Sequence, residues 1–381
     1  MKVLIVHPQM EYYGGAEILI VSLSNILTEK GIYNELLTLS KSKEVEKDLK
    51  AKIIVPDNNV KIRSSGFVSM KDLIKGIFVL RKEVKKRLND FDVIHLQNFP
   101  ASWSLFPNKK PCVWWCNEPP SLWSKPDASV FLKLLNNLRK PVDRFIVRKS
   151  IDVICALDEF NQKRVMDRYG RGSTIIYCGI DYDFFSKGKA QNAIKKFNLK
   201  DKFVVIQSGV LNEIKNPLDS IKTVEKLKEK IPNILLVLAG KSDEKYEIIL
   251  KDYIKKNKLE KYVLFTGNLL REDLRDLYKA SDVGLFPIGL QGGWLAPFEL
   301  LCAEKPIIVS TKISTSDLIK EKEVGVSTDN YADVVLDIFK NKDKYDKMAK
   351  NGALWVKENL SWISFTEKMT ESFEKALNKK H

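Results

Sequence analysis

The sequence has no apolar run that approaches the ~20 residues needed to span a bilayer as a helix. It also has no repeat at solenoid spacing and no low-complexity tract. Its first residues, MKVLIVHP, pass directly into an apolar strand pattern, without the features of a signal peptide. Five cysteines, at positions 112, 116, 155, 178 and 302, lack the spacing of metal ligands. These absences predict reduced core thiols in a cytoplasmic protein.

The composition is that of a soluble globular protein, with 44% apolar and 30% charged residues. At 381 residues the chain is long enough for two domains of ordinary size. The formal net charge is +15, and basic residues gather between Lys71 and Arg87 and again between Lys133 and Lys149. The first stretch has the pattern of an amphipathic helix whose apolar side consists of Leu73, Ile77, Leu80, Val84 and Leu88.

Two interpretations of this charge remain open. One is a solvated surface in a lysine-rich proteome, and the other is a surface that docks on an anionic membrane. Nucleic acid is not expected as a partner, because neither stretch has a recognised binding module.

Short apolar strands alternate with helical patterns along the whole chain, which predicts an α/β fold with parallel sheets. The pattern restarts near the middle, after a join between Gly179 and Lys195, and so predicts two doubly wound domains. The expected strands are Lys2–Val6, Tyr33–Leu39, Asp92–Leu96, Cys112–Trp115, Ile151–Ala156, Phe203–Ser208, Ile234–Ala239, Val263–Thr266, Val283–Pro287, Ile307–Val309 and Gly325–Ser327.

Residues 286–309, FPIGLQGGWLAPFELLCAEKPIIV, are the most informative segment. A strand stops at Pro287, Gly292 and Gly293 follow, and a helix begins near Leu295. Free N–H groups and the helix dipole at such a start form an anion site. Glu299, one turn inside the helix, could bind hydroxyls beside the anion. A nucleotide contains a phosphate next to a ribose diol, so this segment predicts a nucleotide-binding site.

This segment resembles the donor-site motif of glycosyltransferase family 4, whose retaining enzymes have the GT-B fold of two Rossmann-like domains that face each other across a cleft. In the family motif, two glutamates are separated by seven residues. The second glutamate corresponds to Glu299, and the first corresponds to Gln291, which is the main departure from the family pattern. The resemblance implies that Glu299 holds the ribose hydroxyls and that Gln291 contacts the transferred sugar. It also implies that backbone N–H groups of Gly292, Gly293, Trp294 and Leu295 face sugar or phosphate.

Three other loops resemble the family's donor contacts. Gly14 and Gly15 open a helix after the first strand, where the backbone could approach a phosphate. The loop from Gly209 to Lys215 matches the family's phosphate-clamping loop, although Val210 replaces its arginine, which removes a bidentate donor. Leu269 lies in the loop expected to contact the base.

The acceptor side is expected near residues 113–123. Asn117 occupies the position of a histidine that faces the donor sugar in some family members, and Ser121 that of an arginine. Asn117, Glu118 and Trp123 are therefore candidate acceptor-binding residues. Trp114 and Trp115 could stack on a sugar or pack in the core. His7 ends the first strand, and His95 lies in an apolar strand and is expected in the core.

The resemblance implies a metal-independent, retaining hexosyltransferase without a cofactor, in which Gln291, Lys215 and Asn117 are the candidate catalytic residues. The donor would be a nucleotide diphosphate sugar, and the acceptor a glycan or lipid-linked glycan. The enzyme would be cytoplasmic or peripheral on the inner face of the cell membrane. The expected domains are 1–185 for the acceptor, 186–360 for the donor, and 361–381 as a helix that crosses back.

Three alternatives remain. Departures at Gln291, Val210 and Asn117 are compatible with a catalytically impaired homologue that binds a nucleotide sugar or a partner protein. A metal-dependent GT-A transferase would use paired carboxylates such as Asp181 and Asp183, or Asp90 and Asp92. The third alternative is another GT-B chemistry, such as a nucleotide-sugar epimerase.

Overall fold

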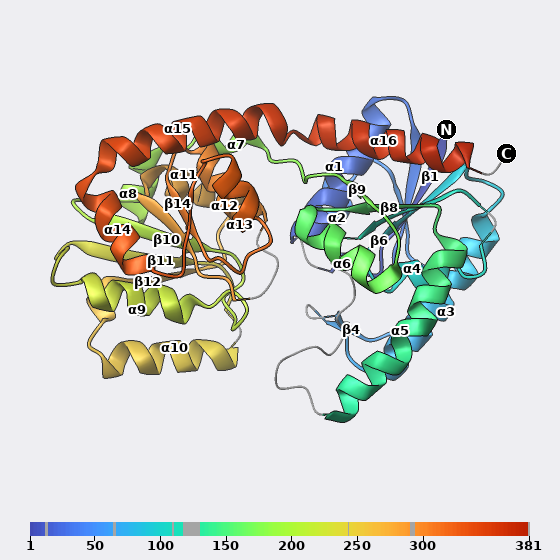
Figure 1. The fold of residues 1–381 in the computed structure, drawn as a ribbon, viewed down its shortest axis with the longest axis horizontal. Coiled ribbons are helices and arrows are strands. Elements are labelled where there is room, and N and C mark those ends of the chain that lie inside the picture. Colours follow the sequence, from blue (N-terminus) through green and yellow to red (C-terminus); the bar gives the residue numbers. More distant parts are fainter. Residues whose placement is uncertain are drawn as a thin grey trace. The chain divides into compact units, whose positions relative to one another are not determined.

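The computed structural model describes residues 1–11, 14–63, 66–108, 110–116, 130–242, 244–289 and 294–379. It describes only the backbone at residues 63, 66, 67 and 130–138. The chain forms two compact units (Figure 1). Unit 1 comprises Met1–Gly179 with Trp362–His381, and unit 2 comprises Ile180–Ser361.

Unit 1 contains a seven-stranded sheet in the order β3-β2-β1-β6-β7-β8-β9, and all of its pairings are parallel. Strands β6 and β7 are buried at every residue and β1 at every residue except Lys2, as expected for a sheet covered on both faces. The strands are β1 Lys2–Val6, β2 Tyr33–Leu37, β3 Lys52–Ile54, β6 Val93–Gln97, β7 Cys112–Cys116, β8 Val153–Ala156 and β9 Thr174–Ile175. A separate antiparallel ribbon pairs β4 Ile62–Arg63 with β5 Gly66–Phe67.

Helices connect the strands of unit 1 and bury its core. They are α1 Gly15–Glu29, α2 Lys43–Asp48, α3 Met70–Arg87, α4 Ala101–Ser104, α5 Val130–Ser150, α6 Glu159–Tyr169 and α16 Trp362–Asn378. One core cluster includes Leu4, Leu96, Trp114, Val147 and Tyr169.

The last helix, α16, belongs to unit 1 although it follows unit 2 in the sequence. It lies beside α1 (Figure 1), where Lys30 Nζ donates to Glu367 Oε1 at 2.7 Å. Its buried side packs on the sheet, because the ring centroids of Phe373 and His95 are 5.5 Å apart. The sequence predicted a helix within residues 361–381, and the structure confirms one there. Among the described residues, no helix is long and apolar enough to cross a membrane.

Unit 2 contains a six-stranded parallel sheet in the order β12-β11-β10-β13-β14-β15. Its strands are β10 Phe203–Ser208, β11 Ile234–Ala239, β12 Val263–Gly267, β13 Val283–Phe286, β14 Ile307–Val309 and β15 Val326–Ser327. Its helices are α7 Tyr182–Phe185, α8 Ala190–Phe197, α9 Pro217–Leu227, α10 Glu244–Lys256, η1 Glu260–Tyr262, α11 Arg271–Ala280, α12 Leu295–Cys302, α13 Ser316–Glu321, α14 Tyr331–Lys340 and α15 Lys342–Asn359.

The two parallel sheets confirm the predicted α/β class with two doubly wound domains. In each sheet the order in which the chain adds strands changes direction at one point. The reversal lies between β1 and β6 in unit 1, and between β10 and β13 in unit 2. Open α/β sheets bind ligands outside the carboxyl ends of the strands at such a point.

Candidate functional site

The carboxyl edge of the unit 2 sheet carries three glycines with positive φ. Gly209, Gly240 and Gly267 follow or end β10, β11 and β12, with φ of 119°, 149° and 67°. The Gly209 N–H donates to the Ala239 carbonyl at 2.9 Å, and the Gly240 N–H donates to the Gly267 carbonyl at 2.9 Å. A Cβ atom at Gly209 or Gly267 would have no heavy atom within 4 Å. The backbone at these two positions is therefore open to close approach.

The loop after β10 holds Lys215 through its backbone. The Lys215 N–H donates to Asn212 Oδ1 at 3.0 Å, and its carbonyl accepts from Gln207 Nε2 at 2.7 Å. Gln207 is itself fixed, because Ser220 Oγ donates to its Oε1 at 2.7 Å. Lys215 is half-buried, whereas Val210, at the arginine position of the family loop, is 55% exposed.

The same loop is tied to the segment that follows β13. The Gly289 N–H donates to the Ile214 carbonyl at 2.9 Å, and Ser310 Oγ donates to the Ile288 carbonyl at 2.6 Å. These bonds bring the chain after β10, β13 and β14 to one edge of the sheet. Three predicted donor-binding residues, Gln291, Gly292 and Gly293, lie outside the described residues.

Helix α12 begins at Leu295, where the sequence predicted a helix start. Trp294 is 4% exposed, and its ring packs on that of Phe298 with centroids 4.7 Å apart and an angle of 43° between the ring planes. The Trp294 side chain therefore anchors the helix start in the core. Leu295 is half-buried.

Glu299, in the second turn of α12, is half-buried and hydrogen-bonded. Tyr278 Oη donates to Glu299 Oε2 at 3.4 Å, and Ser208 Oγ lies 2.7 Å from Tyr278 Oη. Burial raises the pKa of the Glu299 carboxyl to about 7, although Arg271 and the Tyr278 hydrogen bond act to lower that pKa. At neutral pH this group can therefore either donate or accept a proton.

Sequence reasoning missed Tyr278 and Arg271. Tyr278 is fully buried on α11, and no motif in the sequence distinguishes it from other buried aromatic residues. Leu269, the predicted base contact, is half-buried just beyond β12, while Leu270 beside it is 72% exposed.

The glycine turn in unit 1 is occupied by a neighbouring side chain. The Gly14 N–H donates to Glu17 Oε2 at 3.1 Å, and α1 begins at Gly15. His7 Nε2 lies 3.6 Å from Glu17 Oε1, and His7 is only 4% exposed. In this structure Glu17 thus accepts the Gly14 hydrogen bond that the sequence assigned to a phosphate.

The predicted acceptor residues Asn117, Glu118 and Trp123 lie outside the described residues. Trp114 and Trp115, just before them, are buried and pack edge-on against Tyr169 and Phe365. These two tryptophans therefore pack in the core and do not offer a stacking surface to a sugar. His95 is fully buried, as predicted, and burial lowers its pKa to about 4.

In each of the two carboxylate pairs considered for a metal, one carboxylate has another partner. Asp181 accepts from the Phe184 N–H at 3.3 Å and pairs with Arg271 at 3.1 Å. Asp92 Oδ2 accepts from the Lys2 N–H at 2.8 Å. The described ranges contain no group of three His, Cys, Asp or Glu side chains that could hold a metal ion. Together with the two doubly wound sheets, these contacts argue against the GT-A alternative.

Comparison with protein families gives two matches, which together cover most of the chain. Residues 13–184 match the model described as Glycosyltransferase Family 4, and residues 189–355 match Glycosyl transferases group 1.

Two curated proteins show similarity in sequence. The putative glycosyltransferase YtcC of Bacillus subtilis is 22% identical over 327 residues, which cover 77% of this chain and 75% of YtcC. A GDP-mannose-dependent α-(1-6)-phosphatidylinositol monomannoside mannosyltransferase of Mycobacterium tuberculosis is 20% identical over 250 residues. That match covers 61% of this chain and 64% of the mannosyltransferase.

Solved structures share the fold. HepE of Anabaena, in complex with UDP-glucose, superposes with a TM-score of 0.79 at 15% identity, covering 98% of this chain and 99% of HepE. WaaG, a glycosyltransferase involved in lipopolysaccharide biosynthesis, gives a TM-score of 0.77 at 16% identity, covering 97% of this chain and 98% of WaaG.

Proposed function

Since this chain belongs to glycosyltransferase family 4 and is a glycosyltransferase, we propose that it transfers a hexose from a nucleotide diphosphate sugar to a glycan or lipid-linked glycan. We propose further that the transfer retains the configuration of the anomeric carbon and requires no metal or cofactor. Unit 2 would bind the donor, and unit 1 the acceptor.

The observation that carries this proposal is the meeting of three features at one edge of unit 2. The open backbone at Gly209, the loop of Lys215 and the carboxylate of Glu299 all follow or flank β10 and β13, where the sheet order reverses. An ammonium group and an open glycine backbone that permits close approach suit a diphosphate, and a carboxylate suits a ribose diol.

In this proposal the protein mainly positions groups and stabilises charge on the departing diphosphate. Lys215 and the start of α12 would carry out that stabilisation. The acceptor hydroxyl attacks the anomeric carbon on the face that the diphosphate leaves, the bond to the diphosphate oxygen breaks, and a phosphate oxygen takes the hydroxyl proton. Gln291 and Asn117 would contact the transferred sugar.

Two relatives indicate which donors to test first. HepE was crystallised with UDP and UDP-glucose, and the mycobacterial enzyme is GDP-mannose-dependent by name. UDP-, GDP-, ADP- and dTDP-sugars form the test panel, measured by thermal shift and by calorimetry on hits. A hundredfold excess of donor over its Kd should stabilise the protein by ~2.7 kcal/mol.

Two variants test the location of the donor site, and a third serves as a control. Lys215→Ala and Glu299→Ala should weaken donor binding, whereas Lys222→Ala, on the exposed side of α9, should not. Product stereochemistry by NMR and activity in excess chelator test retention and metal independence. If the folded protein binds no nucleotide sugar, the proposal is wrong. Binding without turnover would favour the impaired homologue, which the presence of Val210 at the position of the family arginine supports.

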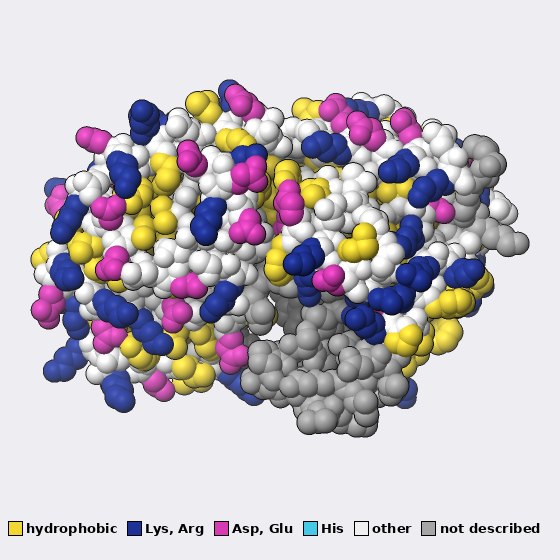
Figure 2. Space-filling model, in the orientation of Figure 1, with side chains coloured by type: hydrophobic (Ala, Val, Ile, Leu, Met, Phe, Trp, Pro, Cys, Tyr) yellow, Lys and Arg dark blue, Asp and Glu magenta, His cyan; other side chains and the backbone are white. Residues whose placement is uncertain are grey.

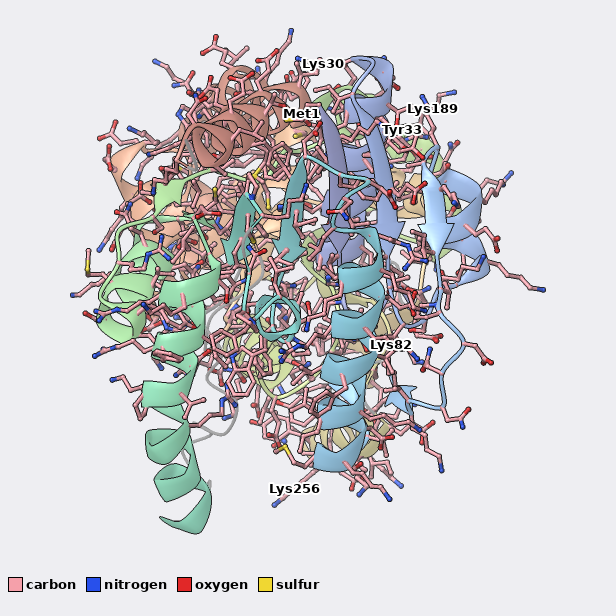
Figure 3. The ribbon with its side chains drawn as sticks, turned by 90° about the vertical axis from the view of Figure 1, so that its right-hand side faces the viewer. Met1, Lys30, Tyr33, Lys82, Lys189 and Lys256 are labelled. Carbon is pink, nitrogen blue, oxygen red and sulfur yellow. The ribbon has the colours of Figure 1, made fainter. Side chains whose placement is uncertain are left out.

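A membrane-associated acceptor is supported by helix α3. Leu80 and Val84 are buried against the unit, but Met70, Ile74 and Phe78 form a stripe at four-residue spacing that is 46%, 49% and 63% exposed. Figure 2 shows hydrophobic side chains bordered by Lys and Arg at this edge of unit 1, and Lys82 projects outward from α3 (Figure 3). Apolar side chains framed by cations are typical of helices that lie in an anionic membrane surface.

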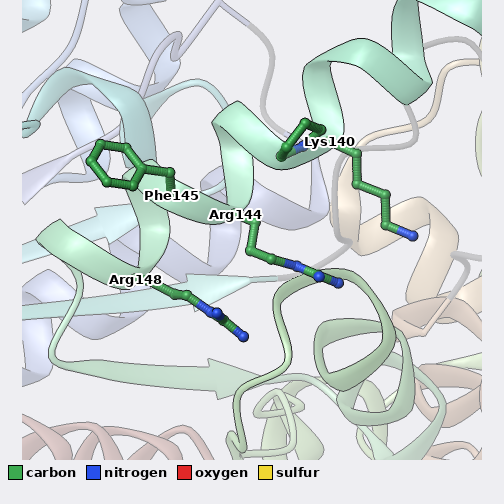
Figure 4. A pocket seen from close by; sticks show the side chains of 5 residues that line it. Lys140, Arg144, Phe145 and Arg148 are labelled. Atoms are coloured by element: carbon green, nitrogen blue, oxygen red, sulfur yellow. The ribbon is translucent and has the colours of Figure 1, made fainter.

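Helix α5 carries a second group of basic side chains. Lys140, Arg144, Phe145 and Arg148 line a hollow of about 430 Å³ on α5, and the three basic side chains project to one side of the helix (Figure 4). Phe145 is 52% exposed, and α4 contacts both α3 and α5. We therefore propose that α3 and α5 dock unit 1 on anionic lipid, where a lipid-linked acceptor would be found.

A further inference from the structure

Three side chains from three elements of unit 2 form one hydrogen-bonded chain. Ser208 is the last residue of β10, Tyr278 lies on α11 and Glu299 lies on α12. Ser208 Oγ is 2.7 Å from Tyr278 Oη, which in turn donates to Glu299 Oε2 at 3.4 Å. Because Gly209 follows Ser208 directly, this chain connects the glycine loop to the carboxylate on α12.

The ring of Tyr278 is held independently of its hydroxyl. Tyr278 is fully buried, and its centroid lies 5.7 Å from that of Phe185 on α7. Burial and the carboxylate of Glu299 raise the pKa of Tyr278 well above its usual value, so the hydroxyl keeps its proton. A fixed, protonated hydroxyl can hold one carboxylate oxygen in place without competing for a proton.

The two oxygens of Glu299 are in different situations. Oε2 accepts the hydrogen bond of Tyr278, whereas Oε1 accepts none from any residue that the structure describes. We infer that Tyr278 is a positioning residue: it fixes Oε2 of Glu299 so that Oε1 faces a hydroxyl of the bound donor. This inference rests on the proposed function, and it adds a residue that the sequence did not indicate.

The charged and titratable groups around Glu299 come from three directions. Tyr278 and Arg271 face it from α11, Asp181 from the segment before α7, and Cys302 from its own helix. The adjoining strands β13 and β14, Val283–Phe286 and Ile307–Val309, contain no titratable residue. Helix α15 packs on α12 through Trp355 and Gly352. Of these groups, Tyr278 alone is hydrogen-bonded to the carboxylate among the described residues.

A carboxylate accepts a hydroxyl hydrogen bond best when it is ionised, so donor affinity should rise as pH passes through the pKa of Glu299, about 7. The Tyr278 hydrogen bond lowers that pKa. Loss of the hydroxyl should therefore move the midpoint of the affinity profile to higher pH. A purely structural role for Tyr278 would not move that midpoint.

The test uses Tyr278→Phe in the full chain, because phenylalanine keeps the buried ring. Dissociation constants for UDP-glucose and GDP-mannose are measured from pH 5.5 to 9 for wild type, Tyr278→Phe and Glu299→Gln. The matched control is Tyr253→Phe, which removes another tyrosine–glutamate bond, 2.7 Å from Tyr253 Oη to Glu225 Oε2, between α10 and α9.

We expect Tyr278→Phe to weaken donor binding about tenfold at pH 7 and to shift the midpoint upward. Glu299→Gln should flatten the pH profile, and Tyr253→Phe should leave both affinity and midpoint unchanged. An unchanged midpoint in Tyr278→Phe would overturn the positioning role while the proposed function stands. If wild type binds neither sugar nucleotide nor any other in the panel, the proposed function itself fails.

Discussion

Gly240 and Gly209 lie so close that a Cβ atom built on Gly240 would overlap the carbonyl oxygen of Gly209. The two residues follow the neighbouring strands β11 and β10, and Gly240 has φ of 149°, which side chains rarely adopt. Both the contact and the backbone angle therefore require glycine at position 240.

Gly240→Ala should destabilise unit 2 by about 2–5 kcal/mol, because it adds both steric overlap and backbone strain. It should also weaken nucleotide-sugar binding, since the Gly209 backbone must move. Gly267→Ala is the control: its φ of 67° is strained, but a Cβ atom there meets nothing within 4 Å. Thermal unfolding of both variants measures the two destabilisations. An equal loss of stability in Gly240→Ala and Gly267→Ala would contradict the steric argument.

Glu299→Gln should raise the melting temperature at pH 8 relative to wild type, and less so at pH 5. The pKa of Glu299 is about 7 in the folded protein, against an ordinary value of 4.5. Between these values the folded state keeps a proton that the unfolded state has released, so the group's contribution to stability falls as pH rises through that window. Glutamine does not titrate, so the variant does not lose stability as pH rises through this window.

Melting curves from pH 5 to pH 8 measure that difference. Glu304→Gln, whose carboxylate is exposed and pairs with Lys279 at 3.5 Å, serves as the control and should show little change. A difference between wild type and Glu299→Gln that does not vary with pH would refute this prediction.

Asp143→Ala should cost unit 1 about 3–5 kcal/mol, because it leaves buried donors without their acceptor. Asp143 is fully buried and accepts from Trp103 Nε1 at 2.7 Å, Arg168 Nε at 2.7 Å and Tyr169 Oη at 3.0 Å. Hydrogen exchange of α5 and α6 peptides should accelerate. Asp273→Ala breaks only an exposed pair with Lys196 and should cost less than about 1 kcal/mol.

A double variant, Ile74→Ser with Phe78→Ser, should bind anionic vesicles at least tenfold more weakly. Each of these apolar side chains contributes about 1.5–3 kcal/mol to the free energy of membrane binding when it is fully buried in the bilayer. Sedimentation with phosphatidylglycerol–phosphatidylcholine vesicles measures this binding. The control, Ile248→Ser with Ile249→Ser, changes two residues of α10 that are 61% and 51% exposed. Equal binding by all three proteins would exclude α3 as the docking helix.

The sequence was sufficient for the central strands. The predicted bounds of β10, β11 and β14 are those of the structure, because each is a continuous run of buried residues between turn signals. Helices such as α5 and α11 were not predicted, because their many charged residues make the helical spacing of the apolar residues hard to recognise in the sequence. In α3, the periodic pattern identified the buried side but did not reveal that Ile74 and Phe78, one residue away from it, remain exposed.

The candidate site was predictable only in part. Motif spacing pointed to Glu299 and Lys215, which the structure places at the carboxyl edge of one sheet. The Ser208–Tyr278 contact joins residues 70 positions apart and depends on the neighbouring positions of β10 and β13, which no local pattern encodes. Trp114 and Trp115 show the opposite case, since their residue type suggested sugar stacking and their strand position determines burial.

The membership of α16 in unit 1 has a consequence for synthesis. The ribosome completes all of unit 2, Ile180–Ser361, before it makes the helix that covers His95 and Cys155. Until then the sheet of unit 1 lacks the cover provided by Phe365 and Phe373, which are buried once α16 has docked. During translation, the first unit to begin folding is therefore the last to be finished, and its incomplete face is available to a chaperone while unit 2 emerges.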